Sequence, residues 1–119
     1  MQNAFFDRHA YENDIELDVN EDVLERIYKD GIKPTDMLPI EFYFLTDTKV
    51  KATNFRNYLK KTFPEYEKIE TRDYNGNFEI SGFTNSKLMS LQSINEWNKA
   101  LWDLGYEFDC KLDGWQVGI

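Results

Sequence analysis

The residues of this chain that could do chemistry are few and poorly placed for catalysis. His9 is the only histidine, and Cys110 is the only cysteine. His9 lies in an N-terminal stretch with no clear pattern, and Cys110 lies on a predicted strand between Phe108 and Leu112. A catalytic thiol or imidazole needs a partner group within hydrogen-bond reach, and Cys110 has no such base nearby in sequence. We therefore predict that the chain is not an enzyme, that His9 is exposed, and that Cys110 is a small buried apolar residue.

Carboxylates are the most abundant chemical groups, and they raise the question of a cation site. Asp14, Glu16 and Asp18 lie close together in sequence. They lack the regular ligand spacing and the central glycine of a calcium loop, so a solvated acidic face is the favoured interpretation. The chain also lacks zinc-ligand spacing and a phosphate-binding glycine motif. We expect no metal and no cofactor.

The charges divide the chain into an acidic and a basic part. The net charge is −8, and residues 1–30 hold nine acidic residues against three basic ones. Residues 49–61 hold five basic residues and no acidic one. Overall acidity argues against nucleic acid as the main partner, because binding it relies on a basic surface that releases counterions. We predict that Glu21, Asp22 and Glu25 steer a basic partner protein, whereas the basic stretch is favoured as a solvated face over a docking patch.

The length of 119 residues predicts one domain with a single core. We place it at residues 18–119, after an N-terminal extension, residues 1–17, of uncertain structure. No apolar run approaches the length that spans a bilayer. The N-terminus lacks the pattern of a secretory signal, and one cysteine cannot form an internal disulfide, so we expect a cytoplasmic protein. The oligomeric state stays open.

The first elements are predicted from periodicity and caps. Apolar residues at helical spacing follow Asn20, a plausible N-cap, and end before Gly31. The stretch 39–47, PIEFYFLTD, alternates as a strand with aromatic residues on both faces. Residues 49–63 then form a helix capped by Asp47 or Thr48, with its apolar stripe at Ala52, Phe55, Leu59 and Phe63.

The clearest local pattern is the hairpin at Asn75-Gly76. Asn-Gly supplies the positive φ angles of a type I′ turn. A two-residue loop pairs Arg72 with Glu79, Thr71 with Ile80 and Ile69 with Gly82.

A second helix and a last strand complete the pattern. Ser93 to Glu96 fits a capping box, and a stripe at Ile94, Trp97, Leu101 and Leu104 is ended by Gly105. Residues 106–112 are predicted as a strand with Tyr106, Phe108, Cys110 and Leu112 on one face. The order β-α-β-β-α-β predicts an α+β, ferredoxin-like sandwich, an antiparallel sheet with two helices on one face, plus the N-terminal helix.

The alternation of apolar side chains along the last strand changes at Asp113-Gly114, just before Trp115. Trp115, Val117 and Ile119 have the opposite parity to Cys110 and Leu112. Asp113-Gly114 is therefore either a bulge with glycine at a positive φ or a two-residue hairpin turn. Both alternatives place Leu112 and Trp115 on the same face.

The chain resembles the regulator of ribonuclease E activity B (RraB) family over roughly residues 18–117. The likeness rests on the link from Gly31 through Pro34 and Asp36 into the first strand, on Leu104-Gly105-Tyr106, and above all on the Asp113-Gly114-Trp115 ending. The resemblance implies a ferredoxin-like fold. It also implies a cytoplasmic protein that binds an RNA-degrading endonuclease of the ribonuclease E type and restrains it, without chemistry of its own.

Other partners remain as alternatives. An immunity-type or small-ligand-sensing domain would use the same acidic face. Tyr43 and Tyr74 could stack RNA bases on the open sheet face, but Glu70 and Glu79 are predicted on that face, so direct nucleic acid binding is disfavoured. For a protein partner we add Tyr43, and also Trp102, which lies at the edge of the helical stripe and would be a hot spot if part-exposed.

Overall fold

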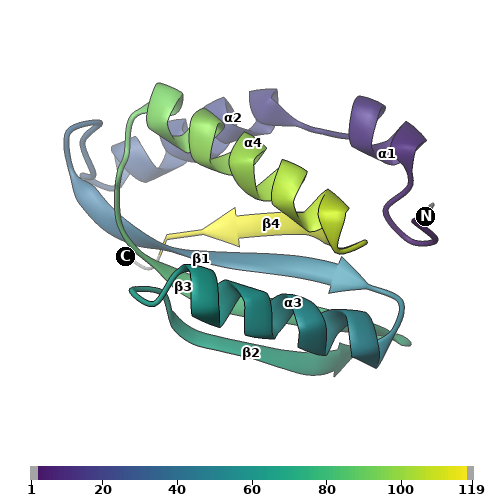
Figure 1. The fold of residues 1–119 in the computed structure, drawn as a ribbon. Helices are drawn as coiled ribbons and strands as arrows, with labels where there is room; N and C mark the ends of the chain where they lie inside the picture. The colour runs from purple at the N-terminus through teal and green to yellow at the C-terminus, as the bar shows by residue number, and fades with distance from the viewer. Residues whose placement is uncertain (1–2, 118–119) are drawn as a thin grey trace.

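The fold places an antiparallel sheet beneath helices, as seen in a computed structural model that describes residues 3–117 (Figure 1). The elements in chain order are α1 (Arg8–Asn13), α2 (Leu17–Lys29), β1 (Met37–Thr46), α3 (Lys49–Thr62), β2 (Glu67–Tyr74), β3 (Asn77–Leu88), α4 (Leu91–Glu107) and β4 (Lys111–Gln116). After α2 the order is β-α-β-β-α-β, as predicted. The protein is therefore an α+β protein.

The sheet has four strands in the order β2-β3-β1-β4, and every neighbouring pair is antiparallel. Alternation along β1 buries Ile40, Phe42, Phe44 and Thr46 on one face. The Phe44 ring contacts Phe55 of α3 at 4.7 Å between ring centroids, and it also lies directly against Gly105 of α4. Because both helices contact the same side chain of β1, they cover the same face of the sheet.

The Asn-Gly hairpin is confirmed. Asn75 and Gly76 have φ angles of 49° and 85°, which a type I′ turn requires. Arg72 pairs with Glu79 and Thr71 with Ile80, as expected, but the register shifts between Glu67 and Glu70. Ile69 still lies against Gly82. The residue before it, Lys68, has a positive φ of 54° and lies within this irregular part of β2.

Asp113-Gly114 is a β-bulge and not a turn, because β4 runs straight through it. Leu112 pairs with Phe44, Gly114 with Tyr43 and Trp115 with Phe42, so Asp113 is the extra residue. Leu112 and Trp115 therefore share the core face, as both alternatives required. Gly114 does not have a positive φ, so that part of the bulge interpretation is wrong. Ile119 lies outside the described residues.

The predicted start of α3 is confirmed, because the helix begins at Lys49 and the Thr48 hydroxyl accepts the Lys51 amide at 3.3 Å. The predicted starts of the other two helices are wrong by about one turn. The first begins at Leu17, so Asn20 is not an N-cap but a buried residue inside α2. The last begins at Leu91 because the Ser90 hydroxyl accepts the Ser93 amide at 3.2 Å. Ser93 is therefore not the cap.

The junction between α4 and β4 also differs from the prediction. Gly105 does not end α4, which runs on to Glu107. The Gly105 carbonyl accepts the Phe108 amide at 3.0 Å and the Cys110 amide at 2.8 Å, and the chain turns at Asp109 with a φ of 56°. Tyr106 and Phe108 are therefore not strand residues. Cys110 is buried in the turn that precedes β4.

The N-terminal residues pack into the core. Phe6 is fully buried, and its ring meets Trp102 at 4.6 Å and Tyr106 at 5.5 Å between centroids. Figure 1 shows α1 over the end of α4. α2 packs along α4 on the side away from α3.

Candidate protein interface

The exposed side of α2 carries a compact acidic face. Asp18, Glu21, Asp22 and Glu25 are all exposed, and at 3.6 residues per turn they fall within about 100° of helix circumference. Leu24 and Ile27, on the opposite side, are buried against the core. The three acidic residues predicted to bind a partner are therefore together on one surface.

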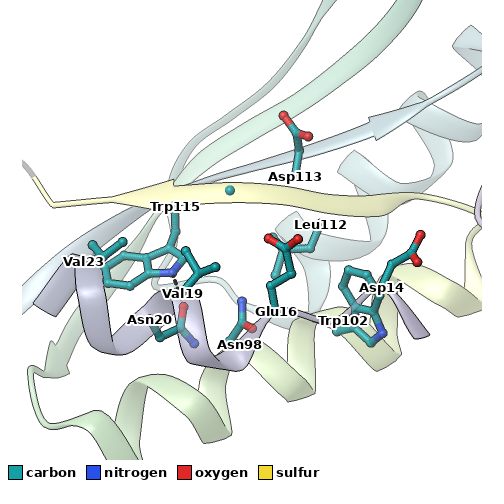
Figure 2. A pocket seen from close by; sticks show the side chains of 11 residues that line it. Asp14, Glu16, Val19, Asn20, Val23, Asn98, Trp102, Leu112, Asp113 and Trp115 are labelled. Carbon is teal, nitrogen blue, oxygen red and sulfur yellow. Dashed lines mark hydrogen bonds between the residues drawn. The ribbon is translucent and has the colours of Figure 1, made fainter. Parts of the chain in front are cut away.

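Beside this helix lies a cleft between α2, α4 and β4, shown in Figure 2. Its volume is about 160 Å³. The lining residues come from the α1–α2 link, α2, α4 and β4: Asp14, Glu16, Val19, Asn20, Val23, Asn98, Trp102, Leu112, Asp113, Gly114 and Trp115. In Figure 2 the Glu16 and Asn98 side chains lie between α2 and β4, whereas the Asp113 carboxylate points away from the helices.

A chain of hydrogen bonds fixes one wall of the cleft. The Trp115 indole N–H donates to Asn20 Oδ1 at 2.8 Å, and Asn20 Nδ2 donates to Asn95 Oδ1 at 2.9 Å. Asn20 is only 2% exposed, and a buried amide needs such partners. The hydrogen bond from Trp115 accounts for a tryptophan at this position. The Trp115 ring packs toward Trp97, at 6.4 Å between ring centroids, and the Trp115 indole N–H connects β4 to α2.

Sequence reasoning missed Asn20, although its position carried a signal. Asn20, Leu24 and Ile27 follow i, i+4, i+7 spacing, which places a polar residue on the buried stripe. A polar side chain in such a place predicts a hydrogen-bonded partner in the fold. The sequence does not identify that partner, which lies 95 positions away.

Trp102 is buried and not part-exposed, so that expectation is wrong. It is 4% exposed, lies under Phe6, and donates its indole N–H to the Tyr11 carbonyl oxygen at 3.0 Å. Lys111 Nζ lies 6.0 Å from the centroid of its ring. Trp102 therefore reaches a partner only through the small part of its ring that lines the cleft.

Tyr43 lies on the uncovered face of the sheet, away from the acidic face of α2. Gln116 Nε2 donates to the Tyr43 hydroxyl at 3.0 Å and to Glu41 Oε1 at 2.6 Å. Burial raises the pKa of Tyr43 to about 12, with a further contribution from Glu41. On the same face Arg72 pairs with the buried Glu79 at 2.7 Å. The structure thus brings Glu21, Asp22 and Glu25 together but does not bring Tyr43 or Trp102 to them.

The two residues considered for catalysis differ in environment. The Cys110 side chain is buried, and this burial raises the pKa of its thiol to about 12. A thiol with such a pKa stays protonated and is a poor nucleophile at neutral pH. His9 is exposed on α1, where Asn13 Nδ2 lies 3.3 Å from its Nδ1. Within residues 3–117 no group of three His, Cys, Asp or Glu side chains is arranged to hold a metal ion.

Comparison with known proteins gives one informative result. A family model described as "Regulator of ribonuclease activity B" matches residues 17–117, which include every element from α2 to β4. No curated protein matches the chain. In the described part of the chain, every helix is too short or too polar to cross a membrane.

Proposed function

The chain belongs to the family of regulators of ribonuclease activity B, and from this membership we propose that it binds an RNA-degrading endonuclease of the ribonuclease E type. The protein restrains the nuclease by protein–protein contact and carries out no chemistry of its own. The observation that carries the proposal is the family match over residues 17–117, because it spans the acidic face of α2 and all of the residues that line the cleft except Asp14 and Glu16.

The chemistry of the side chains supports a non-catalytic role. The single thiol is buried with a raised pKa, and the single histidine lies on an exposed helix 6 residues long. A general base works only when a third group or the substrate holds it in place. The imidazole has only the Asn13 amide of the same exposed helix as its hydrogen-bonding neighbour, and the buried thiol donates to the Phe108 carbonyl oxygen and not to this imidazole.

The charges support a protein partner with a basic segment. The acidic face of α2 projects four carboxylates from one helix surface, and within residues 3–117 none of Glu21, Asp22 and Glu25 forms an ion pair. Such a surface attracts a cationic partner and repels the phosphates of free RNA. The proposal includes a cytoplasmic location, because this protein has to meet a nuclease that cleaves RNA in the cytoplasm.

The test is capture of the nuclease, followed by an inhibition assay. Tagged protein is used to isolate partners from the lysate of its own host, with and without nuclease treatment, and mass spectrometry identifies them. We expect a ribonuclease E-type enzyme that is retained after RNA is digested, and slower RNA cleavage by that purified enzyme when the regulator is added. Failure to bind or slow the purified ribonuclease would overturn the proposal.

We further propose that the domain is a ferredoxin-like sandwich. The β-α-β-β-α-β order, the interior position of β1 and β3, and the packing of α3 and α4 on the same face of the sheet support this assignment. A solved structure that gave another strand order or placed α3 and α4 on opposite faces would contradict it.

A further inference from the structure

The cleft between α2, α4 and β4 contains a side-chain amide that has no hydrogen-bond partner within the described part of the fold. Asn98 is 8% exposed and lines the cleft. Within residues 3–117 its side chain makes no hydrogen bond, whereas the neighbouring Asn20 uses both of its polar atoms. The amide atoms of Asn98 are not sealed from solvent, since the buried side-chain polar atom without a partner in residues 3–117 is Trp97 Nε1. The Asn98 amide therefore faces the open cleft, where a bound group can replace water as its partner. Figure 2 shows the Asn98 side chain directed into the cleft.

The cleft has the size of a single side chain. Its volume of about 160 Å³ is well below the roughly 300–1,000 Å³ of typical small-molecule sites. Trp115 and Trp102 both contribute to its lining, together with the aliphatic side chains of Val19, Val23 and Leu112. Apolar and aromatic walls suit a long side chain with an apolar stem and a polar end.

The charge at the cleft is negative. Glu16 is exposed, and within residues 3–117 it has no ion-pair partner. Figure 2 shows its carboxylate between α2 and β4. Asp14, also at the cleft, pairs with Lys111 at 3.1 Å, and Lys111 lies over the face of Trp102. The Asp14 carboxylate is thus already paired with a cation, whereas Glu16 and Asn98 have no such partner within residues 3–117 and are free to bind one.

We propose that this cleft is a receptor for one arginine side chain of a basic segment in a partner protein. The guanidinium group donates to the Glu16 carboxylate and to the amide oxygen of Asn98, while its planar face and stem lie along the tryptophan and valine walls. Arginine fits better than lysine because its planar fork offers five donors and stacks on aromatic rings. The inference rests on the proposed function, since it specifies how the partner would be held.

The test uses a defined probe instead of the whole nuclease. The probe is a capped five-residue peptide, Gly-Ser-Arg-Ser-Gly, with versions that carry citrulline or lysine in place of arginine. Citrulline keeps the shape of arginine but lacks the charge. Binding is followed by NMR through the side-chain amide of Asn98 and the indole N–H groups of Trp102 and Trp115, in the full chain.

We expect saturable shifts of these signals with the arginine peptide and weaker binding of the lysine peptide. The citrulline peptide should bind roughly tenfold more weakly than the arginine peptide, because it loses one charge-assisted hydrogen bond. Glu16→Gln should weaken binding of the arginine peptide by a similar factor. Glu70→Gln, an equal change of charge on the opposite edge strand β2, should leave it unchanged. Asn98→Ala should also weaken binding, with thermal unfolding measured as a check on its fold.

Equal binding of the arginine and citrulline peptides, or equal effects of Glu16→Gln and Glu70→Gln, would overturn the inference. Glu16 is exposed, so its replacement does not endanger folding and the result stays interpretable. The peptide assay contains no nuclease. If the peptide does not bind but the ribonuclease is still captured, only the arginine site is contradicted. If the peptide binds but the ribonuclease is not captured, only the proposed function is contradicted.

Discussion

At the scale of single residues, Asp109 is the side chain that fastens the N-terminal segment to the domain. Its carboxylate accepts hydrogen bonds from the backbone amides of Ala4, Phe5 and Phe6 at 3.0, 3.1 and 2.6 Å, and from Lys51 Nζ at 2.6 Å. Burial alone would raise the pKa of Asp109. Donors from Lys51 and from the three amides outweigh it and hold the pKa below its ordinary value.

Replacing Asp109 with Asn should lower the free energy of unfolding by about 2 kcal/mol, because hydrogen bonds to a charged group are lost. Asn tolerates the positive φ at this position, so the change removes the charge and one acceptor oxygen without straining the backbone. Chemical denaturation of both proteins measures the difference at neutral pH. Unchanged stability would contradict the anchoring role.

The same residue gives a pH dependence with a defined sign. A carboxyl whose pKa is lower in the folded state contributes stability that is present above the pKa of the unfolded chain and is lost as the pH falls through the folded value. The stability gap between wild type and Asp109→Asn should therefore narrow only in acid, below the ordinary pKa of 3.8. Denaturation curves collected from neutral pH down into this range test the sign. A gap that narrowed toward alkaline pH would contradict it.

The bond between Trp115 and Asn20 makes a second prediction. Trp115→Phe removes the indole N–H and leaves Asn20 Oδ1 buried without its donor, which should cost about 1–3 kcal/mol. Adding Asn20→Leu to that variant removes the unpaired oxygen and should recover part of the loss. A double-mutant cycle by chemical denaturation measures the coupling, and fully additive losses would contradict it.

At the scale of elements, the bulge in β4 is predicted to tolerate loss of its extra residue. Deleting Asp113 alone leaves Leu112 opposite Phe44 and Trp115 opposite Phe42, because Gly114 keeps its place opposite Tyr43. Deleting both Asp113 and Gly114 moves Trp115 opposite Tyr43 and onto the other face of the sheet. The single deletion should cost little stability, and the double deletion at least about 3 kcal/mol. Thermal unfolding measures both losses, and equal losses would contradict the pairing.

The sequence predicted those elements whose geometry is set by neighbouring residues. Asn75-Gly76 determines the hairpin because its positive φ angles are a local property. The end of α4 was mispredicted because Gly105 serves packing instead of capping: a Cβ there would clash with the Cys110 carbonyl oxygen and with Phe44. Trp102 was mispredicted because the residues that cover it, Phe6 and Tyr11, lie more than 90 positions away.

Of the candidate interface, the acidic face of α2 was predictable from the sequence, whereas the cleft beside it was not. Glu21, Asp22 and Glu25 share a face because helical spacing alone determines it. The cleft was not predictable, since Asn20, Asn98 and Trp115 meet only through the packing of α2, α4 and β4. Polar residues on apolar stripes were its only signal in the sequence.

At the scale of the whole molecule, charge is separated between two helices. The acidic face lies on α2 and the lysines on α3, and Figure 1 places α4 between these helices. A basic partner approaching in solution therefore experiences attraction toward one side. Long-range attraction acts mainly on the rate of association and weakens with salt, since the screening length is about 8 Å at physiological ionic strength.

Neutralising the acidic face should therefore slow the approach of a partner more than it shortens the lifetime of the complex. The variant Glu21→Gln/Asp22→Asn/Glu25→Gln is compared with Glu67→Gln/Glu70→Gln/Asp73→Asn, which makes an equal change on the exposed residues of β2. With purified ribonuclease, stopped-flow association across a series of salt concentrations should show a roughly tenfold slower rate and a flatter salt dependence for the α2 variant. The β2 variant should retain most of the wild-type rate. Equal slowing by both variants would mean that net charge, and not the placement of carboxylates on α2, governs the encounter.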